Sequence, residues 1–413
     1  MLLFVRMAFP QGISGSWKGK ISAGGHLVPI IFHFNADSPG TWSGKWDSPD
    51  QNALNLPFSS IEVKGDSVLL GIKMITGSYN GRLVGNDSIA GMWHQGNAFL
   101  PLNFSRFTDT TSRPVKKPFP HEKQVAVTAS DGVRLFGTLL SKTPGQKIVL
   151  IIAGSGPTDR EGNNPAGSAA DSYEMLAHSL DSQNVATFRF DKRGIAESMP
   201  ADFSESNLVF DNYINDVKSI CTFLRDSLKF EDIYLAGHSE GSLIGMVAAQ
   251  TLPVKGYISI AGAGRPIDQV VEQQVNQQPI ADSLKKEITL IFNELREGQT
   301  VASVPSSLKM LFRKSLQPYM MSWLKYDPAA EIKKLRCPVL ILQGTCDKQV
   351  TVTDAENLHH ASLASKWDLI PRMTHTLKDT DEGCTDPNNK TYVDPSLPIN
   401  RQLVKDIVLF VGK

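Results

Sequence analysis

Residues 13–107 carry short stretches in which apolar and polar side chains alternate. Such alternation is typical of strands that bury one face, and turn signals such as Ser38-Pro-Gly40 and Gly85-Asn-Asp87 separate the stretches. The pattern predicts a separate β-rich accessory domain, folded as an antiparallel sandwich or small barrel. The predicted strands are Gly15–Ile21, Leu27–Phe34, Gly40–Trp46, Ser67–Lys73, Tyr79–Val84, Ser88–Trp93 and Ala98–Phe104.

Residues 108–120 are rich in proline, threonine and lysine and are interpreted as a linker. Beyond them the pattern changes, beginning with a hairpin of residues 124–128 and 133–140 around a Ser-Asp-Gly turn. Continuous apolar runs then alternate with helical patterns, at residues 147–152, 185–190, 232–236, 256–261, 338–342 and 367–370. Runs of this kind are typical of a parallel sheet buried on both faces, so residues 121–413 are predicted to form a doubly wound α/β domain.

A long segment with helical pattern, residues 265–330, interrupts this alternation between the fourth and fifth apolar runs. An insertion there is expected to lie as a cap over the carboxyl ends of the strands, where ligands bind in such sheets. At the other end of the chain, the apolar residues that open the sequence are cut by Arg6. Residues 1–12 are therefore interpreted as a frayed terminus or the remnant of a signal segment.

The composition limits the classes of molecule that the chain is expected to bind. The chain has 413 residues, with 41% hydrophobic and 20% charged residues and a formal net charge of +0. A balanced charge argues against nucleic acid or an anionic membrane as partner. No apolar run approaches the roughly 20 residues that a spanning helix needs. A small molecule is the expected ligand, and the oligomeric state is left open.

The 4 cysteines are too few for a scaffold held by disulfides, and no C-x-x-C pair indicates a zinc site. Cys221 lies in a helical pattern and Cys337 begins an apolar run, so both are expected to be buried thiols. Cys346 and Cys384 fall in loops that should converge at the same sheet edge. We hypothesise a disulfide between them, with two free thiols as the alternative.

The stretch Gly237-His-Ser-Glu-Gly241 matches the pattern G-x-S-x-G. It directly follows a buried strand and precedes a helix of small residues, which is the context of a nucleophile elbow. A turn this tight forces Ser239 into strained backbone angles, and flanking glycines let neighbouring chains approach without Cβ clashes. Ser239 is therefore the predicted nucleophile.

The base should follow the serine, and of the nine histidines only His359, His360 and His375 do so. The first two lie in an amphipathic helical pattern and are interpreted as helix residues that face solvent. His375 directly follows a predicted strand and is the expected base. Asp347, in the Gly344-Thr-Cys-Asp347 loop, is the expected acid. Its rivals are Asp354, Glu356 and Asp368, which lie in a helical or strand pattern.

Oxyanion donors are expected from two backbone amides. The first is that of Glu240, at the start of the helix after the nucleophile. The second is that of Ser155, with Gly156 as the alternative, in the glycine-rich loop after the first long parallel strand. Asp159 and Arg160 are expected to pair with each other and hold this loop.

With these motifs, residues 121–413 resemble α/β-hydrolase-fold serine esterases, and among them bacterial carboxylesterases of the EstD type. The resemblance is carried by the Gly-Ser-Gly-Pro-x-Asp-Arg loop, Phe190-Asp-Lys-Arg-Gly194, the elbow, the Gly-x-x-Asp loop and the late His375. Residues 13–107 resemble, more loosely, the β-rich domain often joined to such esterases. One departure is Ala196, where many relatives have glycine, and we expect it to cost little.

The resemblance implies hydrolysis of carboxylic esters, with short to medium acyl groups, through an acyl-enzyme intermediate and without metal or organic cofactor. It also implies export to the periplasm or outside the cell, with the cytoplasm as the alternative. Met320 and Trp323 of the cap are candidates for an apolar substrate pocket, or equally for packing of the cap on the body. The rival functions are a serine aminopeptidase or acyltransferase on the same fold, and a catalytically silent binding protein.

Overall fold

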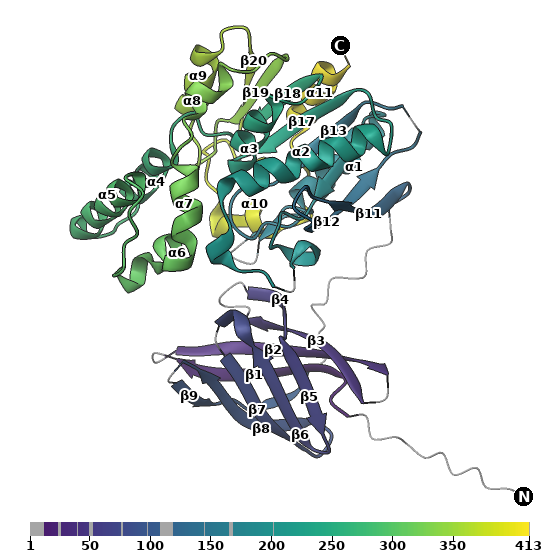
Figure 1. Ribbon diagram of the computed structural model, residues 1–413, viewed down its shortest axis with the longest axis vertical. Helices are drawn as coiled ribbons and strands as arrows, with labels where there is room; N and C mark the ends of the chain where they lie inside the picture. Colours follow the sequence, from purple (N-terminus) through teal and green to yellow (C-terminus); the bar gives the residue numbers. More distant parts are fainter. Residues whose placement is uncertain are drawn as a thin grey trace, which may run out of the picture. The chain divides into compact units, whose positions relative to one another are not determined.

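The computed structural model describes residues 12–23, 26–38, 40–48, 53–75, 77–96, 98–107, 119–143, 145–164, 168–200 and 202–412 (Figure 1). The chain divides into two compact units, Met1–Lys117 and Pro118–Lys413. We call them the β unit and the α/β unit.

The β unit is one antiparallel sheet of 10 strands in the order β4-β3-β2-β1-β10-β8-β7-β6-β5, with β9 paired to β8. A 3-10 turn, η2 (Lys73–Ile75), lies between β6 and β7. The strands are β1 (Gly15–Ala23), β2 (His26–Ser38), β3 (Thr41–Ser48), β4 (Ala53–Pro57), β5 (Ser60–Lys64), β6 (Ser67–Ile72), β7 (Gly77–Val84), β8 (Ser88–Gln95), β9 (Ala98–Pro101) and β10 (Phe104–Phe107).

Aromatic side chains fill the core of the β unit, as the alternation of apolar residues requires. Trp17 and Phe32 are fully buried. The Phe32 ring contacts the rings of Phe58, Tyr79 and Phe104, with centroids 5.2, 5.4 and 4.1 Å away. The strands therefore close around one apolar cluster that belongs to this unit alone.

The β unit differs from the sequence prediction in two places. Strands β4 and β5 were not predicted. The stretch Ala98–Phe104, predicted as one strand, is divided between β9 and β10, which both pair with β8, while β10 also pairs with β1. The break falls at Leu102 and Asn103, where the Leu102 amide donates a hydrogen bond to the carbonyl of Gly91.

The α/β unit is built on a sheet of 8 strands in the order β11-β12-β16-β13-β17-β18-β19-β20. The pairs from β16–β13 to β19–β20 are parallel, while β11 and β12 form an antiparallel edge. A short two-stranded sheet, β14 (Asn163–Asn164) with β15 (Ser168–Ala169), follows β13. The main strands are β11 (Glu122–Thr128), β12 (Arg134–Leu140), β13 (Ile148–Ile152), β16 (Ala186–Phe190), β17 (Ile233–His238), β18 (Gly256–Ile260), β19 (Val339–Gly344) and β20 (Lys366–Ile370).

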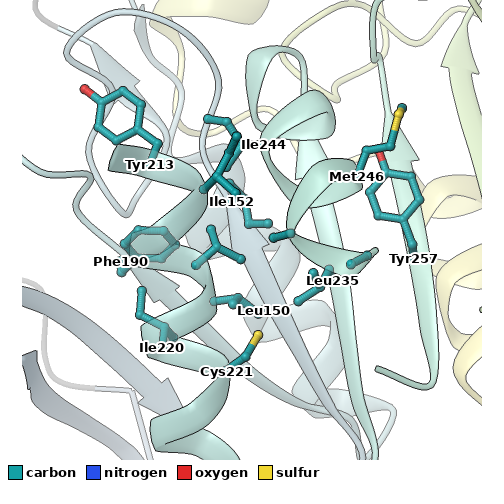
Figure 2. Close-up of a cluster of buried hydrophobic side chains, with 14 of the residues drawn as sticks. Leu150, Ile152, Phe190, Tyr213, Ile220, Cys221, Leu235, Ile244, Met246 and Tyr257 are labelled. Atoms are coloured by element: carbon teal, nitrogen blue, oxygen red, sulfur yellow. The ribbon is translucent and has the colours of Figure 1, made fainter. Parts of the chain in front are cut away.

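Helices cover both faces of this sheet, because alternate residues of each strand point to opposite sides. Helices α2 (Phe210–Asp226), α3 (Glu240–Ala249) and α9 (Val352–Ala361) share a core with Ile148, Leu150 and Ile152. Figure 2 shows Ile220 of α2 and Ile244 of α3 in this core. Helices α1 (Ser172–Ser182) and α11 (Arg401–Val411) share the opposite core, which contains Val149 and Ile151.

The segment expected to form the cap contains helices and 3-10 turns joined by loops, and it groups to one side of the sheet (Figure 1). Part of it has an apolar core of its own, which includes Ile288, Phe292 and Phe312. Its elements are α4 (Ile267–Asn276), α5 (Asp282–Arg296), η5 (Ser306–Leu308), α6 (Lys309–Phe312), η6 (Lys314–Leu316), α7 (Gln317–Trp323) and α8 (Pro328–Ile332).

The remaining short elements lie in loops of the α/β unit. They are η3 (Ala196–Ser198), η4 (Glu205–Asn207), η7 (Pro387–Asn389) and α10 (Lys390–Val393). Among the helices that the structure describes, we find none with the length and apolar character needed to cross a membrane.

Candidate active site

Ser239 lies at the turn between β17 and α3, at the carboxyl edge of the parallel sheet. Its backbone has φ 54° and ψ −119°, a region that residues with a side chain rarely occupy. The turn is held because the Ser239 amide donates to the carbonyl of Ile260 and the amide of Ser242 donates to the carbonyl of Ser239. The predicted nucleophile elbow has this kind of strained strand-to-helix turn.

The two glycines of the motif permit this turn by their lack of a side chain. A Cβ at Gly237 would lie 2.1 Å from the carbonyl oxygen of Gly241, and one at Gly241 would lie 2.3 Å from that of Ile152. Both distances are too short for any substitution without movement of the backbone. The elbow can therefore pack directly against the end of β13.

His375 and Asp347 meet at the same edge of the sheet. The Nδ1 atom of His375 lies 2.8 Å from Oδ2 of Asp347, and both residues are buried. Asp347 follows β19 and His375 follows β20, and these strands are parallel neighbours. The contact leaves Nε2 of His375 as the ring nitrogen available for another partner, as a general base requires.

The other oxygen of Asp347, Oδ1, accepts hydrogen bonds from the amides of Gln349 and Val350. Burial by itself would raise the pKa of Asp347. The neighbouring His375 and these hydrogen bonds outweigh that effect and hold the pKa below its ordinary value. Asp347 is thus an ionised carboxylate that can orient an imidazole and stabilise its charged form.

The expected oxyanion donors lie beside the elbow. Glu240 is the first residue of α3, and Ser155 follows Gly154 in the loop after β13. Gly154 is close to Ser239, since a Cβ on Gly154 would lie 3.2 Å from Cβ of Ser239. Gly156, the alternative donor, has φ 71°. The structure thus brings the Ser155 loop next to Ser239.

His238 connects two loops of the candidate site through hydrogen bonds. Nothing in the sequence pattern predicted this role. Its Nε2 lies 2.9 Å from the carbonyl oxygen of His375, and its Nδ1 lies 2.7 Å from the hydroxyl of Tyr173. A carbonyl can only accept, so Nε2 carries the proton and Nδ1 accepts from Tyr173. The amide of Gly154 donates to the same hydroxyl. One chain of hydrogen bonds therefore runs from the Ser155 loop to His375.

Asp159 and Arg160 do hold the loop after β13, but not by pairing with each other as predicted. Oδ1 of Asp159 accepts hydrogen bonds from the amides of Glu161 and Asn163. The Arg160 guanidinium pairs with Asp191, at 2.6 Å, and with Glu197. The prediction was wrong about the partner because Asp191 and Glu197 belong to the loop after β16, which packs alongside.

Cys346 and Cys384 form a disulfide, with their Cα atoms 5.1 Å apart. Cys346 directly precedes Asp347, so the bond ties the loop of Asp347 to the segment after His375. Cys221 is a buried free thiol, as expected, whereas Cys337 is only half-buried.

The alternative candidates for the base and the acid make contacts elsewhere in the fold. The ring of His359 stacks on that of Trp367, with centroids 5.2 Å apart, and His360 is exposed. Asp354 accepts hydrogen bonds from Arg265 and from Thr351 at the start of α9. These are the contacts of residues that stabilise the fold.

Met320 and Trp323 lie on α7. Met320 is 5% exposed and belongs to the apolar core of the cap, while Trp323 stacks on Phe210 with ring centroids 5.3 Å apart. Of the two roles left open by the sequence, packing of the cap on the body matches these contacts. A role in substrate binding stays a prediction.

Comparison with known proteins finds a curated relative and similar solved structures. Esterase EstD of Thermotoga maritima is 25% identical over 222 residues, which are 50% of this chain and 48% of that protein. The chain thus spans about half the length of this curated relative. Among solved structures, Est1E of Butyrivibrio proteoclasticus with ferulic acid bound is 18% identical, covers 70% of this chain and 100% of its own, and has a TM-score of 0.46. The α/β hydrolase GrgF of a Penicillium species is 14% identical, with coverages of 70% and 98% and a TM-score of 0.48.

The strongest of these findings concerns the family. A family model described as serine aminopeptidase, S33, matches residues 166–381, more than half of the chain. The matched range contains the elbow at Ser239 and the buried pair of Asp347 and His375. The chain therefore belongs to this family, and its α/β unit has the α/β-hydrolase fold.

Proposed function

We propose that the α/β unit is a serine hydrolase that cleaves carboxylic esters of short to medium acyl groups. Ser239 is the nucleophile, His375 the general base and Asp347 the acid that orients it. The amides of Glu240 and Ser155, with Gly156 as the alternative, are the oxyanion donors. A small-molecule ester is the substrate.

In this mechanism, Oγ of Ser239 attacks the ester carbonyl while His375 removes the hydroxyl proton. The negative charge that develops on the carbonyl oxygen is stabilised by the two amides. When the C–O bond breaks, the proton moves from His375 to the leaving alcohol, and the acyl group stays on Ser239. Water, deprotonated by the same imidazole, then releases the acid and restores the serine.

The observation that carries this proposal is the buried contact of 2.8 Å between His375 and Asp347, at the sheet edge where the strained turn presents Ser239. A carboxylate that is buried, ionised and bonded to one imidazole nitrogen leaves the other nitrogen to act as a base. Half of the chain is 25% identical to Esterase EstD, and this similarity supports the choice of esters as substrates.

A fluorophosphonate probe tests the nucleophile. Ser239 should be labelled in the folded protein, and Ser239→Ala should abolish labelling and lower turnover roughly 10⁴-fold or more. Ser227→Ala, which changes an exposed serine after α2, is the matched control and should behave like wild type. Folded protein that resists labelling, with His375→Ala indistinguishable from wild type, would instead support a silent binding scaffold.

The family description itself favours a second candidate, a serine aminopeptidase. The acyl-enzyme mechanism is common to both activities, so the triad does not separate them. Turnover of p-nitrophenyl acetate and butyrate should be compared with that of amino-acid p-nitroanilides. Turnover of the anilides alone would reject the esterase and establish the peptidase.

A further inference from the structure

Lys192 is a buried cation that no step of the proposed mechanism uses. It follows β16 in the segment Phe190-Asp-Lys-Arg-Gly194 and is 1% exposed. Its Nζ lies 2.6 Å from the carbonyl oxygen of Gly154 and 2.8 Å from Oε1 of Glu240. The same Nζ lies 4.7 Å from the centroid of the Tyr213 ring. Each direction in which an ammonium can donate is therefore matched by a partner.

Each of the two groups that Lys192 binds lies close along the chain to one of the proposed oxyanion donors. Glu240 supplies one donor through its own amide. The carbonyl of Gly154 belongs to the same peptide unit as the amide of Ser155, the other donor. One ammonium thus connects the loop after β13 with the first turn of α3.

The contact of Lys192 with the carbonyl of Gly154 affects how strongly the amide of Ser155 can donate. In a trans peptide the N–H points away from the C=O, and the described residues contain no cis peptide bond. A positive charge on the carbonyl oxygen of Gly154 therefore lies at the negative end of the peptide dipole. It draws electron density from the amide of Ser155 and makes that amide a stronger donor, in a site where burial limits screening.

Stability alone does not account for this ion pair. The side chains of Lys192 and Glu240 are each 2% exposed, so both charges lose nearly all of their hydration. The attraction within a buried pair often only balances that loss, and apolar replacements of similar volume are frequently as stable. The ion pair of Lys192 and Glu240 is therefore better explained by a role in orienting nearby groups.

We propose that Lys192 is a positioning residue: it holds and polarises the Gly154–Ser155 peptide and fixes it to the start of α3, so that both amides point at one oxyanion. This proposal rests on the proposed function. It predicts an effect on turnover rather than on substrate binding, because the oxyanion exists only during the reaction.

Two paired substitutions test it. K192Q/E240Q removes both charges but keeps the shapes and the capacity for hydrogen bonds, and should lower kcat about tenfold with KM within about twofold. K192M/E240L also removes the hydrogen bonds and should lower kcat about 100-fold. The rate constant for labelling of Ser239 by the fluorophosphonate should fall in parallel.

The matched control is R193M/D216L, which removes the neighbouring buried ion pair of Arg193 and Asp216. It should leave kcat unchanged. If either Lys192 variant is folded by its thermal transition and has a kcat within twofold of wild type, the proposal is wrong. Wild-type protein that neither turns over the substrates nor reacts with the probe would instead overturn the proposed function.

Discussion

Ser239 and Ala196 both hold their backbones at positive φ, 54° and 44°, although neither is glycine. At Ser239 the strained turn is held by hydrogen bonds to Ile260 and Ser242, and it presents the proposed nucleophile. Ala196 is exposed in a loop that contributes no residue to the proposed triad. The expectation that alanine costs little here thus needs revision, since the backbone favours the glycine of the relatives.

We expect Ala196→Gly to stabilise the α/β unit by up to about 1 kcal/mol. Relief of the left-handed conformation, worth about 1–2 kcal/mol, exceeds the roughly 0.5–1 kcal/mol of entropy that glycine costs. Calorimetric unfolding measures the difference. The control is Ala330→Gly in α8, an exposed helical position, which should lose about 1 kcal/mol. Equal losses at both positions would contradict this account of Ala196.

His238 is neutral in the native protein. Burial, and secondly the proximity of His375, lower the pKa of His238 from 6.5 to about 3. In the unfolded chain His238 takes up a proton as the pH falls below about 6.5, while the folded protein does not until about pH 3. The stability contribution is thus fully present above pH 6.5 and is lost as the pH falls toward 3.

His238→Gln should therefore flatten this part of the stability curve, because glutamine offers a donor and an acceptor but does not titrate. The advantage of wild type over the variant should shrink by roughly 1.4 kcal/mol per pH unit at most as the pH falls. Denaturant titrations between pH 7 and pH 4 measure it. Parallel curves for the two proteins would show that His238 is not the group responsible.

The strands of the α/β unit lie close to where the apolar runs predicted them. The run at 147–152 became β13 (Ile148–Ile152), and the run at 256–261 became β18 (Gly256–Ile260). A strand buried on both faces has an apolar side chain at every position, so it is visible in the sequence without knowledge of its neighbours. Strands β4 and β5 are short, and their role as the two ends of the β-unit sheet order depends on partners elsewhere in the chain.

The loops at the carboxyl edge are tied by the disulfide of Cys346 and Cys384, which are 38 positions apart. We expect C346A/C384A to lower the free energy of unfolding by about 2–4 kcal/mol, because the open loop gains entropy in the unfolded chain. Thermal unfolding with and without dithiothreitol measures this. Wild type should lose stability on reduction and the variant should not. Unreduced wild-type protein with both thiols reactive would contradict the bond.

The two units have separate apolar cores, that of the β unit centred on aromatic rings and those of the α/β unit on the two faces of its sheet. Each unit can therefore bury its own apolar surface, which is the requirement for independent stability. We propose on this basis that the β unit is an accessory module and that residues 118–413 carry the chemistry.

Phe32→Ala should destabilise the β unit by about 3–5 kcal/mol, because it empties a fully buried site between aromatic rings. Calorimetry should show one transition moved to lower temperature and the other unchanged, with ester turnover at 25 °C retained. Phe99→Ala, at an exposed position of the same unit, is the control and should move neither transition. Turnover that falls together with the β-unit transition would show that the units depend on each other.

The residues that carry the proposed chemistry were predictable from local pattern. Ser239 lies between a buried strand and a helix of small residues, and Asp347 and His375 each follow a strand of one parallel sheet. Parallel strands end at a common edge, so order along the chain was enough to expect that Asp347 and His375 meet. Their contact of 2.8 Å agrees with that expectation, while their catalytic roles stay predictions.

Lys192 could not be recognised in the same way. In the sequence it is a charged residue in a loop, where exposure to solvent is the ordinary state. Its partners Gly154 and Glu240 are 38 and 48 positions away, and they meet it only because β16, β13 and β17 are neighbours in the sheet. Local patterns specify strands, turns and the order of reactive residues, because these depend on nearby side chains. Burial, charge pairing and the partners of a side chain depend on segments that only folding brings together.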